Sequence, residues 1–328
     1  SGCSAIFGRN SIHHRLPKFT ISVQLTGQRF DRFPKSNLSN QRLLFLPVLF
    51  LPKIIIKIPM NSLPLFQIDA FADKVFGGNP AAVIPLEEWL STETMQKIAL
   101  ENNLSETTFI YQDEHKNYHI RWFTPAIEVD LCGHATVAAA YYLFKIAGIT
   151  DDVITFQSKS GELFVTEKDN WFYLDFPAMD LIAEVVSEKL TKGMGTAPKA
   201  AYKSKDDWQL IYESQEEIEN LDPDFNILKS FPVWNTPARG IIATAKSSEE
   251  GVDFVSRFFA PAAGINEDPV TGSAHTKLIP YWAKELNKTE MVAKQLSQRS
   301  GFLKCTLKND RVLIGGQAVL YMVGNIYI

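Results

Sequence analysis

Two short glycine turns, each at the start of an apolar helical segment, are the features of this sequence best suited to chemistry. The first turn, at 132–136, reads Cys-Gly-His-Ala-Thr, and the second, at 271–275, reads Thr-Gly-Ser-Ala-His. A glycine turn at a helix start leaves backbone N–H groups free, and the helix dipole adds partial positive charge there. Two such helix starts aimed at one cleft would grip a small carboxylic acid from both sides. Alternatively, these glycines serve only close packing, but their occurrence as a pair favours a site.

Neither turn has the sequence of a nucleotide-binding loop. No Gly-Lys-Ser/Thr follows either glycine, and no G-x-G-x-x-G motif follows a predicted strand. The histidines, cysteines and acids show no metal-ligand spacing either. We therefore predict a site with no metal and no cofactor.

Glu106 is the third candidate for chemistry. It lies between a predicted helix, 92–100, and a predicted strand, 108–111, among small hydroxyl residues and beside Phe109. A glutamate at such a junction is usually a solvated or capping residue. Desolvation in a closed apolar cleft strengthens a carboxylate as a base, and one carboxyl group can take a proton from carbon and return it.

The two turns belong to an internal repeat. Residues 121–126, Arg-Trp-Phe-Thr-Pro-Ala, resemble residues 257–262, Arg-Phe-Phe-Ala-Pro-Ala. After each copy come a short acidic stretch, one of the glycine turns and an apolar helical segment. The same order in both copies indicates a duplication.

The helical segment that follows the first turn, 137–144, is apolar almost all round, which predicts a helix buried on every side within a sheet. We predict an α+β fold of two pseudo-symmetric lobes, 60–180 and 181–328, each a mostly antiparallel or mixed sheet wrapped around a central helix. Short β-branched and aromatic stretches supply the strands: 65–71, which alternates as a core strand should, and 153–156, 163–166, 171–176, 240–245 and 311–314.

Composition narrows the function classes further. Hydrophobic residues make up 45% of the 328 residues and charged residues 21%, as in a globular protein. A net charge of -4 argues against a nucleic-acid partner. Three cysteines, Cys3, Cys132 and Cys305, are too few for a disulfide framework, which favours a reducing, cytoplasmic setting.

Residues 1–59 differ from the rest, with nine Lys or Arg and a single acid, Asp31. Such a basic segment is typical of a transit peptide, which would make the location organellar. A membrane anchor is disfavoured, because the apolar run 43–51 is far shorter than the about 20 residues that span a bilayer. We favour a third interpretation, upstream sequence translated by mistake ahead of Met60, and predict no membrane association.

Six sequence blocks of the chain resemble the PhzF-like (phenazine biosynthesis PhzF) family, within the diaminopimelate epimerase-like fold. Nothing before Met60 resembles the family, and the likeness runs from about 63 to 326. The blocks stand in the family's order at 69–71, 77–83, 103–109, 131–136, 267–274 and 315–319.

The resemblance implies a site between two lobes, often in a homodimer, with Glu106 as the acid/base. It implies an isomerase that moves a proton on a small cyclic or amino carboxylic acid without metal or cofactor. The best-known reaction of the family isomerises a dihydro-hydroxyanthranilate. The residues that it implies for substrate binding are His134, Asp268, Ser273, Gly133 and Gly272.

Two other functions stay open. A racemase or epimerase of this fold uses a cysteine from each turn, but the second turn has no cysteine, so we expect Cys132 to be a small buried filler. A non-catalytic binding protein of the same fold is the other alternative. Individual roles are open too, because Asp268 could orient His134 or bind the substrate, and Ser273 could be only a helix cap.

Overall fold

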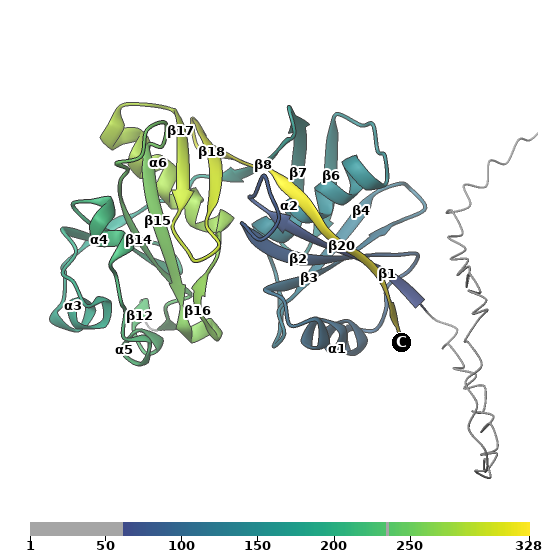
Figure 1. Cartoon of the computed structure of the whole chain (residues 1–328), viewed down its shortest axis with the longest axis horizontal. Helices are drawn as coiled ribbons and strands as arrows, with labels where there is room; N and C mark the ends of the chain where they lie inside the picture. The colour runs from purple at the N-terminus through teal and green to yellow at the C-terminus, as the bar shows by residue number, and fades with distance from the viewer. Residues whose placement is uncertain (1–61, 234–235) are drawn as a thin grey trace, which may run out of the picture. The chain divides into compact units, whose positions relative to one another are not determined.

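The computed structural model describes residues 62–233 and 236–328, and it shows two lobes, each a curved sheet wrapped around one helix (Figure 1). The predicted α+β fold is confirmed. The predicted extension 1–59 lies outside the described residues. Among the helices of 62–233 and 236–328, none is long and apolar enough to cross a membrane.

The sheet of the first lobe pairs its strands in the order β20-β1-β2-β3-β4-β6-β7-β8, with β5 beside β4. Its helix α2 continues into a π-helical turn, Tyr142–Ile146. The elements are β1 (Ser62–Ala70), β2 (Asn79–Leu86), α1 (Thr92–Asn102), β3 (Glu106–Gln112), β4 (Tyr118–Phe123), β5 (Glu128–Val129), α2 (Gly133–Tyr141), β6 (Val153–Ser158), β7 (Gly161–Lys168), β8 (Trp171–Pro177) and β20 (Ala318–Tyr327).

The sheet of the second lobe runs β9-β10-β11-β14-β15-β17-β18-β19, with β16 beside β15. A small separate ribbon pairs β12 (Pro232–Val233) with β13 (Thr236–Pro237). The other elements are β9 (Ile182–Glu184), α3 (Glu188–Met194), β10 (Ala200–Lys203), β11 (Asp207–Ile211), α4 (Gln215–Glu219), α5 (Phe225–Lys229), β14 (Gly240–Lys246), β15 (Phe254–Ala260), η2 (Pro261–Ala263), β16 (Ile265–Asp268), η3 (Gly272–Ala274), α6 (His275–Leu286), β17 (Glu290–Gln295), β18 (Gly301–Lys308) and β19 (Arg311–Gly316).

The internal repeat reappears as matched strands with matched ion pairs. Both repeat segments form strands, β4 and β15, and each pairs in parallel with the strand that follows its central helix. Arg121 binds Glu128 through Nε and Nη2 at 2.7 and 2.8 Å, and Arg257 binds Glu267 in the same way at 2.8 and 2.9 Å. The acidic stretch after each copy therefore has the same structural function in both lobes, as expected of a duplication.

The two sheets are joined where β8 pairs antiparallel with β19. From there the chain crosses back, because β20 pairs along its length with β1. The predicted division at 180 and 181 stays a prediction. Strand β20, at 318–327, pairs with β1 and so completes the sheet of the first lobe. The sequence could not show this, because the partner strand lies at the opposite end of the described chain.

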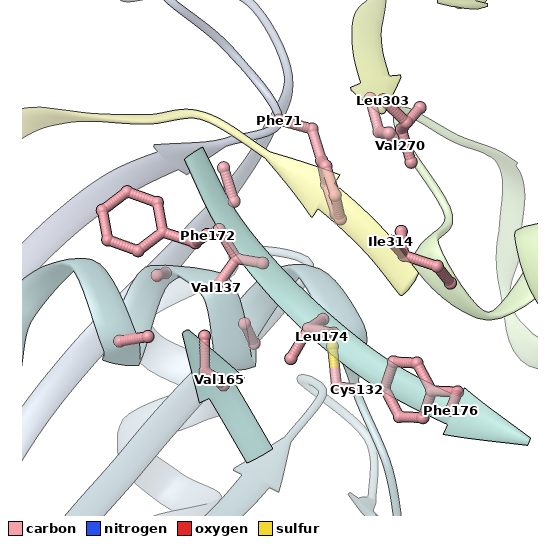
Figure 2. Packing of buried hydrophobic residues seen from close by; sticks show 14 of the residues in the cluster. Phe71, Cys132, Val137, Val165, Phe172, Leu174, Phe176, Val270, Leu303 and Ile314 are labelled. Carbon is pink, nitrogen blue, oxygen red and sulfur yellow. The ribbon is translucent and has the colours of Figure 1, made fainter. Parts of the chain in front are cut away.

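The core is shared between the lobes. Every residue of α2 from Gly133 to Ala140 is buried, whereas Tyr141, Tyr142 and Phe144 at the end of the predicted segment 137–144 are partly exposed. Figure 2 shows Val137 of α2 beside β8, with Ile314 and Leu303 of the second lobe in the same cluster. Because burying each such side chain is worth about 1.5–3 kcal/mol, this cluster ties the lobes together.

Strand β1 departs from the predicted alternation at its end, where Asp69 is buried with only 2% exposed. Arg299 of the second lobe covers it, with Nη2 2.8 Å from Asp69 Oδ1, and also donates to the carbonyl oxygens of Gly77 and Gly78 at 2.8 Å each. An inward acid is tolerated because its charge is paired. The arginine thereby fixes the loop that leads into β2.

Gly78 is the most demanding residue of this loop. Its φ is +60°, and an added Cβ would lie 2.0 Å from the carbonyl oxygen of Ala70. We expect Gly78→Ala to lower the free energy of unfolding by at least ~3 kcal/mol, since left-handed backbone costs an L-residue roughly 1–2 kcal/mol before any clash. Gly148 has a φ of +74° with nothing within 4 Å, so Gly148→Ala is the matched control and should cost only ~1 kcal/mol. Urea denaturation of both variants measures the difference, and equal losses would contradict the role of the contact.

His275 is fully buried inside the second lobe. Its Nδ1 lies 2.9 Å from the carbonyl oxygen of Thr271, and its ring packs against Phe254. Burial lowers the pKa of His275 to about 4. In the unfolded chain, His275 takes up a proton below its ordinary pKa of about 6.5. In the folded state it stays neutral until the pH is much lower. Stability from this group is complete above about pH 6.5 and is lost as the pH falls toward 4.

Between pH 7 and pH 5 this linkage predicts a loss of roughly 2 kcal/mol in the free energy of unfolding. His275→Asn retains a side-chain donor but cannot titrate, so the pH dependence of its stability should be weaker by that amount. His115, an exposed residue of the β3–β4 turn, supplies the control, and His115→Asn should keep the wild-type dependence. Urea denaturation at pH 7 and pH 5 measures the free energy of unfolding of each variant. If His275→Asn loses as much stability between the two pH values as the wild type does, His275 is not the source of the pH dependence.

Candidate active site

Gly133 and Gly272 bring the two predicted helix starts into direct contact. A Cβ added to Gly133 would lie 3.5 Å from the Cα of Gly272, and one added to Gly272 would lie 3.6 Å from the Cα of Gly133. Helix α2 begins at Gly133, and Gly272 begins the short turn that runs into α6. A methyl group at either position would make only ordinary van der Waals contact, so the two turns lie directly against each other without a backbone strain or clash that demands glycine. The sequence-predicted meeting of the two turns is observed.

Glu106 lies beside the first turn, as the first residue of β3. Its Oε2 is 2.9 Å from Nε2 of His134, and the two side chains are 13% and 6% exposed. The contact is an ion pair that is not aligned as a hydrogen bond, so both buried atoms lack an aligned hydrogen-bond partner. Within the described part of the chain, nothing bonds to the other carboxylate oxygen, Oε1.

His134 is favoured in its protonated form. Burial alone would lower the pKa of His134, but Cys132 and Glu106 outweigh it and hold the pKa well above its usual range. Burial and Glu106 also raise the pKa of the Cys132 thiol to about 11, so the thiol is neutral near pH 7. The charge that favours the imidazolium therefore comes from Glu106. Cys132 is buried, as predicted of a filler, and its Sγ lies 3.5 Å from Nδ1 of His134.

Asn79 connects this pair to the second lobe, and sequence reasoning missed it. Its Nδ2 donates to Asp268 Oδ1 at 2.8 Å and to the carbonyl oxygen of Val270 at 3.0 Å, and lies 3.2 Å from Nδ1 of His134. The amide of Asn79 therefore lies between Asp268 and His134. The available signal was the Gly-Gly-Asn-Pro sequence at 77–80, whose glycines form the loop held by Arg299.

Asp268 is a partly buried acid held in place from several sides. Thr271 Oγ1 donates to its Oδ2 at 2.5 Å, and Gln295 Nε2 donates to its backbone oxygen at 2.8 Å. Burial and the charge of Glu106 raise the pKa of Asp268, against the lowering effects of His134, Thr271 and Asn79. Because its pKa is raised, Asp268 takes up a proton more readily than an ordinary aspartate, and in the protonated form it can donate a hydrogen bond.

Ser273 has a partner that the sequence did not predict. Its Oγ accepts a hydrogen bond at 2.9 Å from Nη1 of Arg239, a residue just before β14. The alternative that Ser273 only caps a helix is not supported, because Thr271 is at the N-cap of η3 and Ala274 at that of α6. No sequence motif distinguishes Arg239, and only the fold brings it to the second turn.

A metal ion is poorly matched to these side chains. Ligand atoms of Glu106, Cys132 and His134 all lie within 4.8 Å of one another, the only such group of at least three among residues 62–233 and 236–328. However, Glu106 contacts Nε2 of the imidazole ring and Cys132 faces Nδ1. An ion held by one ring nitrogen is not placed to take ligands from both sides of the ring. The absence of a metal stays a prediction.

The other histidines of residues 62–233 and 236–328 lie elsewhere. His275 is enclosed in the core, and His119 forms an ion pair with Asp113 at 3.0 Å beside the β3–β4 turn. A cavity of about 230 Å³ between Phe71, Trp171 and Phe302 contains no predicted site residue. The structure thus gathers Glu106, His134, Asp268 and Ser273 around the paired glycines, and adds Asn79 and Arg239.

Comparison with known proteins gives consistent matches over the described part of the chain. The family model of phenazine biosynthesis-like proteins, PhzC-PhzF, matches residues 68–324. An uncharacterised isomerase from Pseudomonas aeruginosa is 46% identical over 267 residues, which cover 81% of this chain and 100% of the relative. A phenazine biosynthesis-like domain-containing protein from Homo sapiens is 38% identical over 292 residues, covering 81% and 99%.

Solved structures agree with these matches. The structure of a phenazine biosynthesis protein of the PhzF family from Enterococcus faecalis has a TM-score of 0.78 and 45% sequence identity, covering 82% of this chain and all of that one. A predicted epimerase from Pseudomonas aeruginosa has a TM-score of 0.61 at 17% identity, with 80% and 99% covered, and shares the fold.

Proposed function

The chain belongs to the phenazine biosynthesis-like PhzC-PhzF family, and from this we propose that it is a cofactor-independent isomerase of a small cyclic or amino carboxylic acid, with Glu106 as its acid/base. The observation that carries the proposal is the buried contact of Glu106 with His134 beside the paired glycines. The implied homodimer and cytoplasmic location stay predictions.

Glu106 has the geometry of a carboxylate that handles protons. One oxygen is held by His134, whereas Oε1 has no partner within the described residues. In the proposed step Oε1 takes a proton from a C–H bond of the substrate, and the bond's electron pair shifts the adjacent double bond. The protonated Glu106 then returns the proton to another carbon. Atoms and electrons balance within the substrate, so the step needs no oxidant or co-reactant.

His134 and Asp268 assist in different ways. His134 contacts Oε2 of Glu106 at 2.9 Å and thereby orients the carboxylate, so that Oε1 is left to act on the substrate. Asp268 is placed to hydrogen-bond an amine or hydroxyl group of the substrate. The amide of Asn79 donates to Asp268 and packs against Nδ1 of His134 at 3.2 Å, so it lies between the two side chains.

The two-thiol racemase is disfavoured by the equivalent residues of the second lobe. When β14 and β15 are aligned with β3 and β4 on the repeat arginines, Gly240 takes the position of Glu106. Thr271 likewise takes the position of Cys132 in the second turn. The second lobe therefore offers neither a second glutamate nor a second thiol, which supports a single acid/base.

We expect the chain to exchange a carbon-bound hydrogen of its substrate for deuterium in D2O, and Glu106→Gln to reduce this exchange at least ~100-fold, since general acid–base catalysis contributes 10²–10⁴-fold. The probes are 2,3-dihydro-3-hydroxyanthranilate and a panel of cyclic and amino acids, followed by proton NMR. Exchange that survives in Glu106→Gln would rule out this base. Binding of a probe without exchange in the wild type would favour the non-catalytic alternative.

The same assay separates a carboxylate from a thiol mechanism. Cys132 is buried and neutral near pH 7, so we expect Cys132→Ala to retain exchange within about tenfold of the wild type. The small loss reflects a changed contact with His134 and not a lost base. A loss as large as that of Glu106→Gln would assign the proton transfer to the thiol.

A further inference from the structure

The pseudo-symmetry of the lobes gives the Glu106–His134 pair a counterpart in the second lobe. Arg239 immediately precedes Gly240, which takes the position of Glu106. Ser273 takes the position of His134 in the second glycine turn. Arg239 Nη1 and Ser273 Oγ are 2.9 Å apart, the same separation as in the first lobe. One lobe thus presents an acid beside its turn, and the other presents a cation.

Phe258 explains why the second lobe has Arg239 and no acid at the position equivalent to Glu106. A Cβ on Gly240 would lie 2.0 Å from the ring of Phe258, so no side chain fits where the first lobe has Glu106. The guanidinium of Arg239 instead lies over this ring at 5.3 Å from its centroid. Such stacking favours arginine over lysine and sets the plane of the guanidinium.

Buried charges fix the direction of Arg239 before any ligand binds. Its Nη2 donates to Oδ2 of Asp207, a residue with no exposed surface, and Lys277 Nζ donates to the same oxygen at 2.7 Å. Because Lys277 shares this carboxylate, Asp207 does not serve Arg239 alone. The Arg239 side chain is still 37% exposed, so part of the guanidinium remains accessible.

The guanidinium is also close to the proposed catalytic groups. Burial alone would lower the pKa of Arg239, but the carboxylates of Asp207, Asp206 and Asp268 outweigh it, and Asp268 is the acid that Asn79 connects to His134. Arg239 also donates to Ser273 beside Gly272, whereas Glu106 contacts His134 beside Gly133, so both residues adjoin the paired glycines.

We propose that Arg239 and Ser273 form a carboxylate-binding subsite, in which the guanidinium and the serine hydroxyl hold the carboxylate of the substrate while Glu106 acts on its carbon skeleton. The inference rests on the proposed function for the type of ligand, a small cyclic acid. A guanidinium with fixed orientation and free N–H groups suits a planar carboxylate, which it can bind through two parallel hydrogen bonds. In this proposal Glu106 of the first lobe transfers the proton, and Arg239 and Ser273 of the second lobe bind the substrate carboxylate.

Benzoate and benzamide test the subsite without turnover, because they share a shape and differ in charge. We expect wild-type protein to bind benzoate at least ~10-fold more tightly than benzamide, as charge-assisted hydrogen bonds of this kind provide. Arg239→Gln should abolish the preference, and Arg239→Lys should retain only part of it. Affinities come from ligand-observed NMR titrations, with thermal unfolding to verify that each variant is folded.

Arg311→Gln is the control, since the side chain of Arg311 is about as exposed as that of Arg239 and pairs with Asp175 in another part of the fold. It should keep the wild-type preference. The subsite would be overturned if the wild type bound both probes equally or bound neither. It would also be overturned if Arg239→Gln kept the preference for benzoate while both Arg239 variants remained folded. Failure of the proposed function is distinguishable, because it would remove deuterium exchange and leave the benzoate preference intact.

Discussion

The contact between the backbones of Gly133 and Gly272 is the constraint on which the rest of this structure depends. At this contact the helix starts of the two lobes lie side by side, with no side chain between their backbones. Glu106, His134, Asp268 and Ser273 come together only because the lobes approach this closely. The shared apolar cluster and the β8–β19 pairing hold that approach in place, so the site needs both lobes.

The two lobes have equivalent surroundings at their glycine turns, but the residues beside the turns differ. Arg121 with Glu128, and Arg257 with Glu267, preserve the same scaffold in both lobes. Beside the turns the equivalence ends, because Glu106 corresponds to Gly240. A symmetric site would treat both faces of a substrate alike, as a two-base racemase does. An asymmetric one is suited to moving a proton within one molecule.

Much of this arrangement follows from local sequence, and the remainder depends on contacts that local patterns do not encode. The all-apolar segment after Gly133 predicts a buried helix, and the repeat predicts two lobes. Glu106 and His134 stand out through position and family resemblance. Asn79 does not, because its importance lies in reaching Asp268 across 189 positions of sequence. Arg239 does not stand out in the sequence either, since only the register of β14 and the packing of Phe258 bring it to Ser273.

The return of β20 to the first lobe has a consequence for how the chain is made. During synthesis on the ribosome, β1 emerges before every other described element, whereas its partner β20 emerges only after the whole second lobe. Until then one edge of β1 has no strand to pair with, and an open edge invites association with other nascent chains. The first lobe therefore matures only after the second has been translated, and chaperones that cover exposed strands would act in that interval.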